Sequence, residues 1–203
     1  MLYIFDKTYS LPDDFSETVK PLLSIERYEK IQKLKSKKNK TTSAVAYLLL
    51  RLALKDAYSI DEVVTFEYQK LGKPTLRKFP DIHFSISHSK NAAASAVAGL
   101  PIGVDIQNIS SVSDKAAKRV LTADEYLAYK EADRPDEYFC EIWSIKESFL
   151  KKSGKGITEE MGHISADDID MKTVVKGEDY FCCVCGAEME IKHIRREDFE
   201  QLR

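Results

Sequence analysis

Two side chains that carry oxygen alternate with apolar residues between positions 102 and 107. Successive side chains of a β-strand point to opposite faces, so the apolar residues at 102, 104 and 106 share one face. Asp105 and Gln107 share the other face with Gly103, which leaves room for a ligand. Two neighbouring oxygen ligands suit a hard cation such as Mg²⁺. A solvated strand face explains the same pattern equally well, so this segment alone leaves both interpretations open.

Apolar residues recur at helical spacing from about residue 136 to residue 152 and predict a long amphipathic helix. Trp143, Glu147 and Lys151 lie four residues apart on a neighbouring stripe, with Lys146 beside them. A carboxylate between two lysines and near an indole could hold a metal ion and phosphate oxygens. Ordinary Glu-to-Lys pairing on an exposed helix also fits this spacing, and the periodicity alone favours it.

Three of the four cysteines lie close together, at positions 182, 183 and 185. They could form a zinc site with His163 or His193, but they lack the paired C-x-x-C arrangement. We favour a buried strand, because a free cysteine behaves as a small hydrophobic residue. This spacing is also poor for a disulfide framework, which favours a reducing cytoplasm.

The composition predicts a folded protein with no global charge excess. The chain has 203 residues, of which 43% are hydrophobic, and its 31 lysines and arginines nearly balance 33 acidic residues. No run of about 18 apolar residues is present. We therefore expect a soluble, unexported cytoplasmic protein that binds neither nucleic acid nor membrane.

Residues 27 to 40 carry seven cations against one acid, Glu29. A solvated face is the usual explanation for such a stretch. A patch that binds nucleic acid is the alternative, although the stretch lacks interleaved aromatic residues.

The pattern of elements predicts two similar halves. Strands are expected at 2–5, 63–68, 82–87, 92–98, 102–107, 164–169, 171–175, 180–187 and 190–194, with further helices at 25–35 and 42–58. A capping box formed by Thr122 and Glu125 opens another helix. Ser24 and Tyr28 have the same spacing as Thr122 and Tyr126, which suggests an internal repeat. We therefore expect an N-terminal subdomain at 1–100 and a C-terminal subdomain at 101–203.

Four motifs occur together in a characteristic order: Gly72-Lys73-Pro74, Phe84 to Ser89, Ile102 to Asp105, and Trp143 to Lys151. In order and interval they resemble the Sfp-type 4'-phosphopantetheinyl transferases. The resemblance is clear from about residue 66 to 156 and fainter elsewhere. It implies an α+β fold of two similar subdomains related by pseudo-twofold symmetry, with coenzyme A bound between them.

The resemblance also implies a reaction and partners. Such an enzyme transfers 4'-phosphopantetheine from coenzyme A to a serine of an apo acyl- or peptidyl-carrier protein, releases adenosine 3',5'-bisphosphate and depends on Mg²⁺. Relatives with two fused halves are commonly monomeric, so we expect a monomer. A non-catalytic module that binds coenzyme A, or a nucleic-acid-binding protein, is the competing hypothesis.

The site residues follow from the same resemblance. The implied metal ligands are Asp105, Gln107 and Glu147. The implied coenzyme contacts are Arg27, Lys30 and Ser43 at the 3'-phosphate, Lys73 and Pro74 at the nucleotide, and Ser87, His88 and Lys151 near the diphosphate. The implied catalytic residues are Glu147 as general base, Lys151, and Glu125 acting with Lys146, although Glu125 fits its capping box equally well.

Two positions depart from the family pattern. Gln107 stands where many members have a second acid, so metal affinity is expected to be lower or a water takes that coordination place. Thr42 stands where an arginine commonly precedes the hydroxyl residue, and Lys38 or Lys40 could supply the missing charge.

Overall fold

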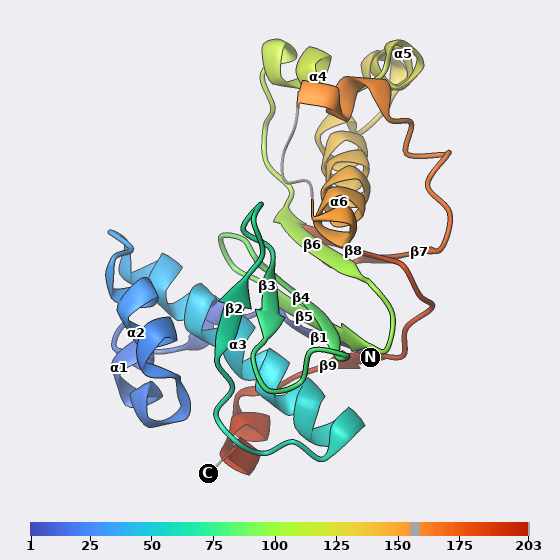
Figure 1. Ribbon diagram of the computed structural model, residues 1–203. Coiled ribbons are helices and arrows are strands. Elements are labelled where there is room, and N and C mark those ends of the chain that lie inside the picture. Colours follow the sequence, from blue (N-terminus) through green and yellow to red (C-terminus); the bar gives the residue numbers. More distant parts are fainter. Residues whose placement is uncertain (155–158, 203) are drawn as a thin grey trace.

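Both halves of the chain begin with a strand, continue into helices and end with strands, four in the first half and two in the described part of the second. The computed structural model describes residues 1–154 and 159–202 (Figure 1). The first half contains β1 (Leu2–Phe5), α1 (Phe15–Thr18), α2 (Ile25–Gln32), α3 (Lys37–Tyr58), β2 (Phe66–Tyr68), β3 (Pro74–Leu76), β4 (His83–His88) and β5 (Ala93–Ala98). The second half contains β6 (Gly103–Asn108), α4 (Asp114–Val120), α5 (Ala123–Glu131), α6 (Pro135–Ser153), β7 (Lys172–Lys176) and β8 (Tyr180–Cys185), and β9 (Ile191–His193) follows. Short 3-10 turns lie at Thr8–Ser10, Lys20–Leu22, Glu159–His163 and Arg196–Leu202.

Strand pairing follows the same plan in both halves. In the first sheet, β5 lies between β4 and β1 and is antiparallel to both. In the second sheet, β8 lies between β7 and β6 and is again antiparallel to both. The long helix α3 packs on the first sheet and α6 packs on the second, on the sides that face away from each other (Figure 1). This topology confirms the predicted α+β class, and its repetition agrees with two similar halves.

Capping residues explain where several of these helices begin and end. At the start of α2, the Ser24 hydroxyl accepts a hydrogen bond from the Arg27 amide at 3.2 Å. At the start of α5, Thr122 and Glu125 form the expected capping box, in which each side chain bonds the backbone amide of the other residue. Helix α6 ends at Gly154, whose φ of 72° lies in the left-handed region that glycine adopts without strain.

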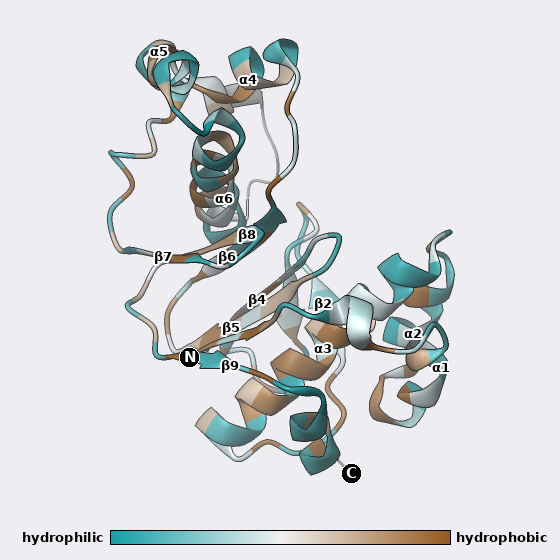
Figure 2. Ribbon diagram, turned by 180° about the vertical axis from the view of Figure 1, so that it is seen from behind, coloured by the Kyte–Doolittle hydropathy of each residue, from teal (hydrophilic) through white to brown (hydrophobic). Residues whose placement is uncertain are grey.

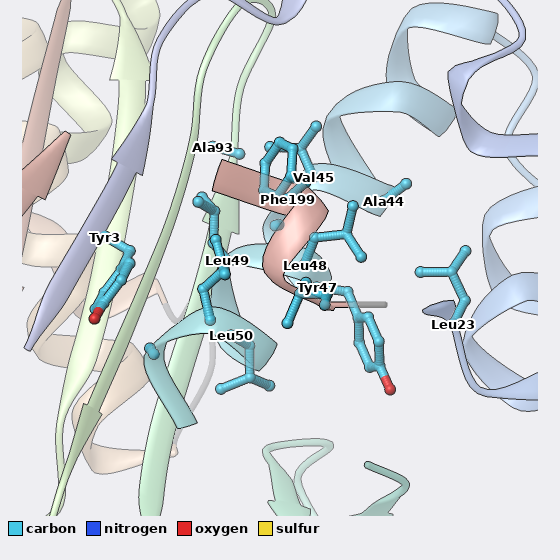
Figure 3. Close-up of a cluster of buried hydrophobic side chains, with 14 of the residues drawn as sticks. Tyr3, Leu23, Ala44, Val45, Tyr47, Leu48, Leu49, Leu50, Ala93 and Phe199 are labelled. Carbon is cyan, nitrogen blue, oxygen red and sulfur yellow. The ribbon is translucent and has the colours of Figure 1, made fainter. Parts of the chain in front are cut away.

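Alternation along the strands divides the buried side chains into three layers. In β1, Tyr3 faces α3, whereas Ile4 faces the second sheet. The apolar residues predicted to share one face of β6, at 102, 104 and 106, lie in the layer between the sheets. Every residue from 44 to 50 in α3 is fully buried. Figure 2 shows the hydrophobic residues of this helix, and Figure 3 shows several of its side chains in the packed core.

Within the described ranges, no helix is both long and apolar enough to cross a membrane.

Serine hydroxyls join the two sheets where β4 meets β6. These strands belong to separate sheets. The Val104 amide donates to Ser85 Oγ at 2.9 Å, and the Ile106 amide donates to Ser87 Oγ at 3.3 Å. All four residues are buried, so the amides at this edge of β6 depend on the hydroxyls for an acceptor. The motif that contains Ser85 and Ser87 therefore holds the halves together.

Gly103 allows α6 to lie directly against β6. A β-carbon at this position would lie 2.0 Å from the Ser148 carbonyl oxygen and 2.3 Å from the Lys152 amide nitrogen. The sequence suggested that this glycine leaves room for a ligand, but helix backbone fills the space instead. The close approach places α6 beside the strand that carries Asp105.

Residues 164–169 do not form the predicted strand. They are irregular chain after a 3-10 turn, and Ala166 and Ile169 pack into the core with α6. The Ala166 amide donates to Glu125 Oε1 at 2.8 Å, so a carboxylate replaces a strand partner. Other predicted boundaries shift by up to five residues, the largest shift being the start of α3 at Lys37 rather than Thr42.

The C-terminal segment returns to the first half. Strand β9 pairs in parallel with β1, and Phe199 and Leu202 pack into the core around α3. This segment therefore completes the first sheet, although it belongs to the second range of the predicted division. The division into 1–100 and 101–203 stays a prediction.

Replacing Ser85 with alanine should lower the free energy of unfolding by about 1–3 kcal/mol, because the buried Val104 amide would lose its acceptor. Urea denaturation measures this difference. Ser95→Ala is the matched control, since Ser95 is fully buried but its hydroxyl has no hydrogen-bond partner in the described structure. That variant should be as stable as the parent or more so. Equal losses in the two variants would show that the Ser85 hydroxyl does not secure β6.

Candidate active site

Asp105 lies where the two sheets meet and has a partner on each carboxylate oxygen. Its Oδ1 atom accepts hydrogen bonds from Ser87 Oγ at 2.8 Å and from Lys151 Nζ at 2.5 Å. Its Oδ2 atom accepts from Gln107 Nε2 at 2.8 Å. The residue is 1% exposed. The structure thus brings together four of the residues that the sequence singled out.

Glu147 is the second buried carboxylate in this region. The residue is 4% exposed, and its Oε1 atom has no hydrogen-bond partner in the described part of the chain. Burial raises the pKa of Glu147 to about 7, with a further increase from the negative charge of Asp105 and an opposing effect from Lys151. A strand carboxylate and a helix carboxylate of the second half therefore interact electrostatically.

The donor set around these acids fits a hard cation. Mg²⁺ prefers oxygen ligands and keeps several of its waters. The unpartnered Oε1 of Glu147 is a free acceptor, and Gln107 could offer its amide oxygen if its amide turned away from Asp105. Across residues 1–154 and 159–202, no three Asp, Glu, His or Cys side chains gather into a metal-binding group. The predicted ligands thus stay two acids and an amide, Asp105, Glu147 and Gln107.

Cations from both halves line a neighbouring pocket of about 360 Å³. Arg27 and Lys30 contribute from α2, and Lys151 contributes from α6. Arg27 is 7% exposed, and its Nη2 atom donates to the carbonyl and hydroxyl oxygens of Ser43, both at 2.9 Å. Its Nε atom has no partner among the described residues. A buried cation with a spare donor suits an anionic ligand. Because Arg27 is buried, the basic stretch at 27–40 is not one continuous exposed face.

Aromatic and apolar residues form another wall of this pocket, and the sequence had not singled them out. Phe66, Tyr68 and Leu71 line it from β2 and the turn that follows. The Lys30 ammonium lies 5.0 Å from the centre of the Tyr68 ring. In the sequence, only their position just before the Gly72-Lys73-Pro74 turn could have indicated that they line a site. Isolated aromatic residues in a strand usually belong to a core.

His88 lies in the same pocket as a neutral side chain. Its Nδ1 atom is 3.4 Å from Thr42 Oγ1. Displacement of water by the surrounding protein lowers the pKa of His88, and the positive charges of Arg27 and Lys151 lower it further. The imidazole ring therefore offers a hydrogen bond rather than a positive charge at pH 7. Thr42, at the position where the resemblance leads us to expect an arginine, reaches this histidine.

Lys73 and Pro74, for which the resemblance implies contacts with the nucleotide, also line the pocket. The Lys73 ammonium, however, donates to two backbone carbonyl oxygens, those of Lys152 at 2.7 Å and Ile102 at 3.3 Å. The resemblance predicted a nucleotide contact for this side chain. In the structure it bonds the second half of the protein instead.

Lys146 and Glu125 are paired with each other, away from the Asp105 cluster. Lys146 is fully buried, and its Nζ atom lies 2.5 Å from Glu125 Oε2. The same ammonium donates to the carbonyl oxygens of Val120 at 2.7 Å and Met161 at 3.1 Å. All three donors of the Lys146 ammonium are thus used inside the protein, and the pair ties α4, α5 and α6 together. The expected catalytic roles of Lys146 and Glu125 stay predictions.

Comparisons with known proteins agree with the motif pattern. Residues 101–195 match the sequence model of the 4'-phosphopantetheinyl transferase superfamily. A 4'-phosphopantetheinyl transferase of Bacillus subtilis is 32% identical over 200 residues, a match that covers 89% of each chain. The chain belongs to this superfamily. The 4'-phosphopantetheinyl transferase Sfp of Bacillus subtilis (strain 168) is 34% identical to this transferase over 151 residues, which is 73% of this chain and 67% of the relative. The predicted Sfp-type family and the predicted enzyme class are confirmed.

Replacing Lys146 with methionine should destabilise the transferase by about 3–5 kcal/mol, because Glu125 would stay buried without its charge partner. The double variant with Glu125→Gln should lose less than the sum of the single losses, since neither charge remains. Chemical denaturation of the four proteins measures this coupling. The same cycle on Lys176 and Glu137, a surface pair at 2.7 Å, is the control and should show little coupling. Strictly additive losses at Lys146 and Glu125 would contradict the assignment.

The raised pKa of Glu147 predicts how stability depends on pH when metal ions are removed. Its carboxyl group has a pKa of about 7 in the folded protein and 4.5 as the ordinary value, so the folded state binds more protons between these values. The free energy of unfolding should therefore fall as the pH rises from about 4.5 to about 7. Denaturation in EDTA across this range measures the slope. Gln cannot ionise, so the free energy of unfolding of Glu147→Gln should fall less over this pH range. The same slope in the variant and the parent would refute the raised pKa of Glu147.

Proposed function

We propose that this transferase moves the 4'-phosphopantetheine group of coenzyme A to a serine of an apo acyl- or peptidyl-carrier protein, in a reaction that depends on Mg²⁺. The observation that supports it most is the pair of buried carboxylates, Asp105 and Glu147, next to a pocket lined by cations from both halves. Adenosine 3',5'-bisphosphate is the second product.

The pocket offers separate places for the parts of coenzyme A. Arg27, with its unpartnered Nε atom, binds the 3'-phosphate together with Lys30 and Ser43. The apolar wall that contains Tyr68 and Pro74 receives the adenine, because a flat aromatic group buries well against such a surface. The diphosphate then lies between this wall and Lys151, within reach of His88.

The chemistry requires charge neutralisation and a proton acceptor. The carrier serine oxygen attacks the phosphorus nearer the pantetheine, and the bond from that phosphorus to the leaving adenosine bisphosphate oxygen breaks. Glu147, whose Oε1 atom has no hydrogen-bond partner among the described residues, accepts the serine proton. Lys151 stabilises negative charge on the transferring phosphate. A magnesium ion held by Asp105, Gln107 and Glu147 would supply further neutralisation at the diphosphate.

The carrier surface involves the second half. From the family resemblance we expect the carrier helix to contact residues 119–121, of which Val120 and Leu121 are buried. Arg119 is exposed and remains available for an acidic partner. We propose that charge rather than apolar contact guides the carrier at this end of α4.

The decisive experiment incubates the protein with coenzyme A, Mg²⁺ and a panel of apo carrier proteins, followed by intact-mass measurement. A gain of one phosphopantetheine on the carrier serine is expected. Asp105→Ala and Glu147→Ala should lower the rate by about 100-fold or more, because charge stabilisation or the base is lost. Glu137→Ala, which removes an acid from the surface of the same helix, should have little effect. Tight coenzyme A binding without transfer to any carrier would favour a non-catalytic coenzyme-binding module instead.

Gln107→Glu should increase the rate at limiting Mg²⁺, because a third carboxylate strengthens attraction for the cation. The same change replaces the amide that now donates to Asp105, so it should lower stability in EDTA through repulsion between like charges. Rate measurements over a magnesium titration and denaturation in EDTA check the two effects. A variant with an unchanged magnesium dependence would remove Gln107 from the ligand set.

A further inference from the structure

The strand pair formed by β2 and β3 is too small to hold its own position. Only three residue pairs join the two strands, and an isolated hairpin of this kind is marginally stable in water. At its base, Phe66 packs against Phe84 with ring centres 4.9 Å apart. At its tip, Tyr68 and Leu71 are exposed at 54% and 67%. The tip, which forms one wall of the pocket, therefore needs another anchor.

Lys73 supplies a contact from this tip to the second half of the protein. The turn is closed by the Gln69 amide, which donates to the Lys73 carbonyl oxygen at 2.9 Å. The Lys73 side chain then runs past Gly154, where an added β-carbon would lie 3.3 Å from its Cδ atom. Its ammonium reaches Lys152 O at 2.7 Å and Ile102 O at 3.3 Å.

The main acceptor lies at the C-terminal end of α6. The last four carbonyl groups of a helix lack partners within the helix, and they carry partial negative charge that favours a cation. The Gly154 amide donates hydrogen bonds to the carbonyl oxygens of Leu150 and Lys151. The carbonyl of Lys152 is bonded by Lys73, so the lysine caps α6 from outside the helix.

We infer that Lys73 is a positioning residue, whose ammonium fastens the β2–β3 hairpin to the end of α6 and so holds the two walls of the coenzyme pocket at a set separation. One wall carries Tyr68 and Leu71, and the other carries Lys151. This assignment rests on the proposed function only for the identity of the ligand. It differs from the nucleotide contact that the family resemblance predicted for the Lys73 side chain, because a capping lysine acts before any ligand arrives.

Lys73→Met tests the clamp, because methionine keeps much of the side-chain length but cannot donate a hydrogen bond. Lys70→Met is the matched control, since Lys70 is an exposed lysine of the same hairpin. Hydrogen exchange of the amides from 66 to 76 in the free protein should become about tenfold faster in Lys73→Met, because a hydrogen bond from a charged donor is lost. Lys70→Met should exchange like the parent. Lys73→Arg, which keeps a cationic donor, should restore slow exchange at least in part.

Coenzyme A binding by calorimetry and steady-state kinetics complete the test. The dissociation constant for coenzyme A should rise severalfold in Lys73→Met, whereas KM for the carrier should stay close to that of the parent. Weaker coenzyme binding with unchanged hairpin exchange would overturn the inference and support direct contact with the nucleotide. Faster exchange with unchanged coenzyme binding, or no change in either, would also overturn it. Exchange in the free protein does not depend on transfer activity, so failure of the proposed function would be seen separately, in the parent protein.

Discussion

The hydroxyl group of Ser87 is the contact on which both the joint between the halves and the site depend. It accepts hydrogen bonds from the Ile106 amide and from Lys151 Nζ, and it donates to Asp105 Oδ1. One buried hydroxyl therefore connects β4 of the first half with β6 and α6 of the second. Because these groups are shielded from water, losing one partner would leave the others unsatisfied. The structure places the Asp105 carboxylate with the same bonds that join the sheets.

Charge in this region is balanced within the protein before any ligand is bound. Asp105 pairs with Lys151, and burial raises the pKa of Glu147 toward neutrality. Arg27 uses Nη2 on Ser43 and keeps Nε unbonded among the described residues. Isolated buried charges are costly, so this balance lowers the cost of burying several ionisable groups together. Under the proposed function, a diphosphate and a divalent ion bring charges of both signs and can be accommodated as a unit.

The helix motif that carries the family resemblance combines two different tasks. Lys146 and Glu147 are adjacent in sequence, yet successive residues on a helix point about 100° apart. Lys146 consequently reaches Glu125 in the outer part of the second half, whereas Glu147 interacts with Asp105 at the seam. Trp143, with its ring centre 5.8 Å from that of Phe139, is partly buried and packs against the core of the second half. Adjacent residues of one motif thus face different parts of the second half.

The sequence by itself determined the features that depend on neighbours within a few residues: the repeated order of elements, the capping box at Thr122 and the apolar face of β6. The tertiary structure decided which distant groups meet. The sequence predicted a strand at 164–169, but the Ala166 amide bonds the Glu125 side chain. Lys146 matched a catalytic position and Lys73 a nucleotide contact, but their ammonium groups bond backbone carbonyls far away in the chain. Periodicity and capping are local properties that spacing reveals, whereas the partner of a long flexible side chain depends on the packing of whole elements.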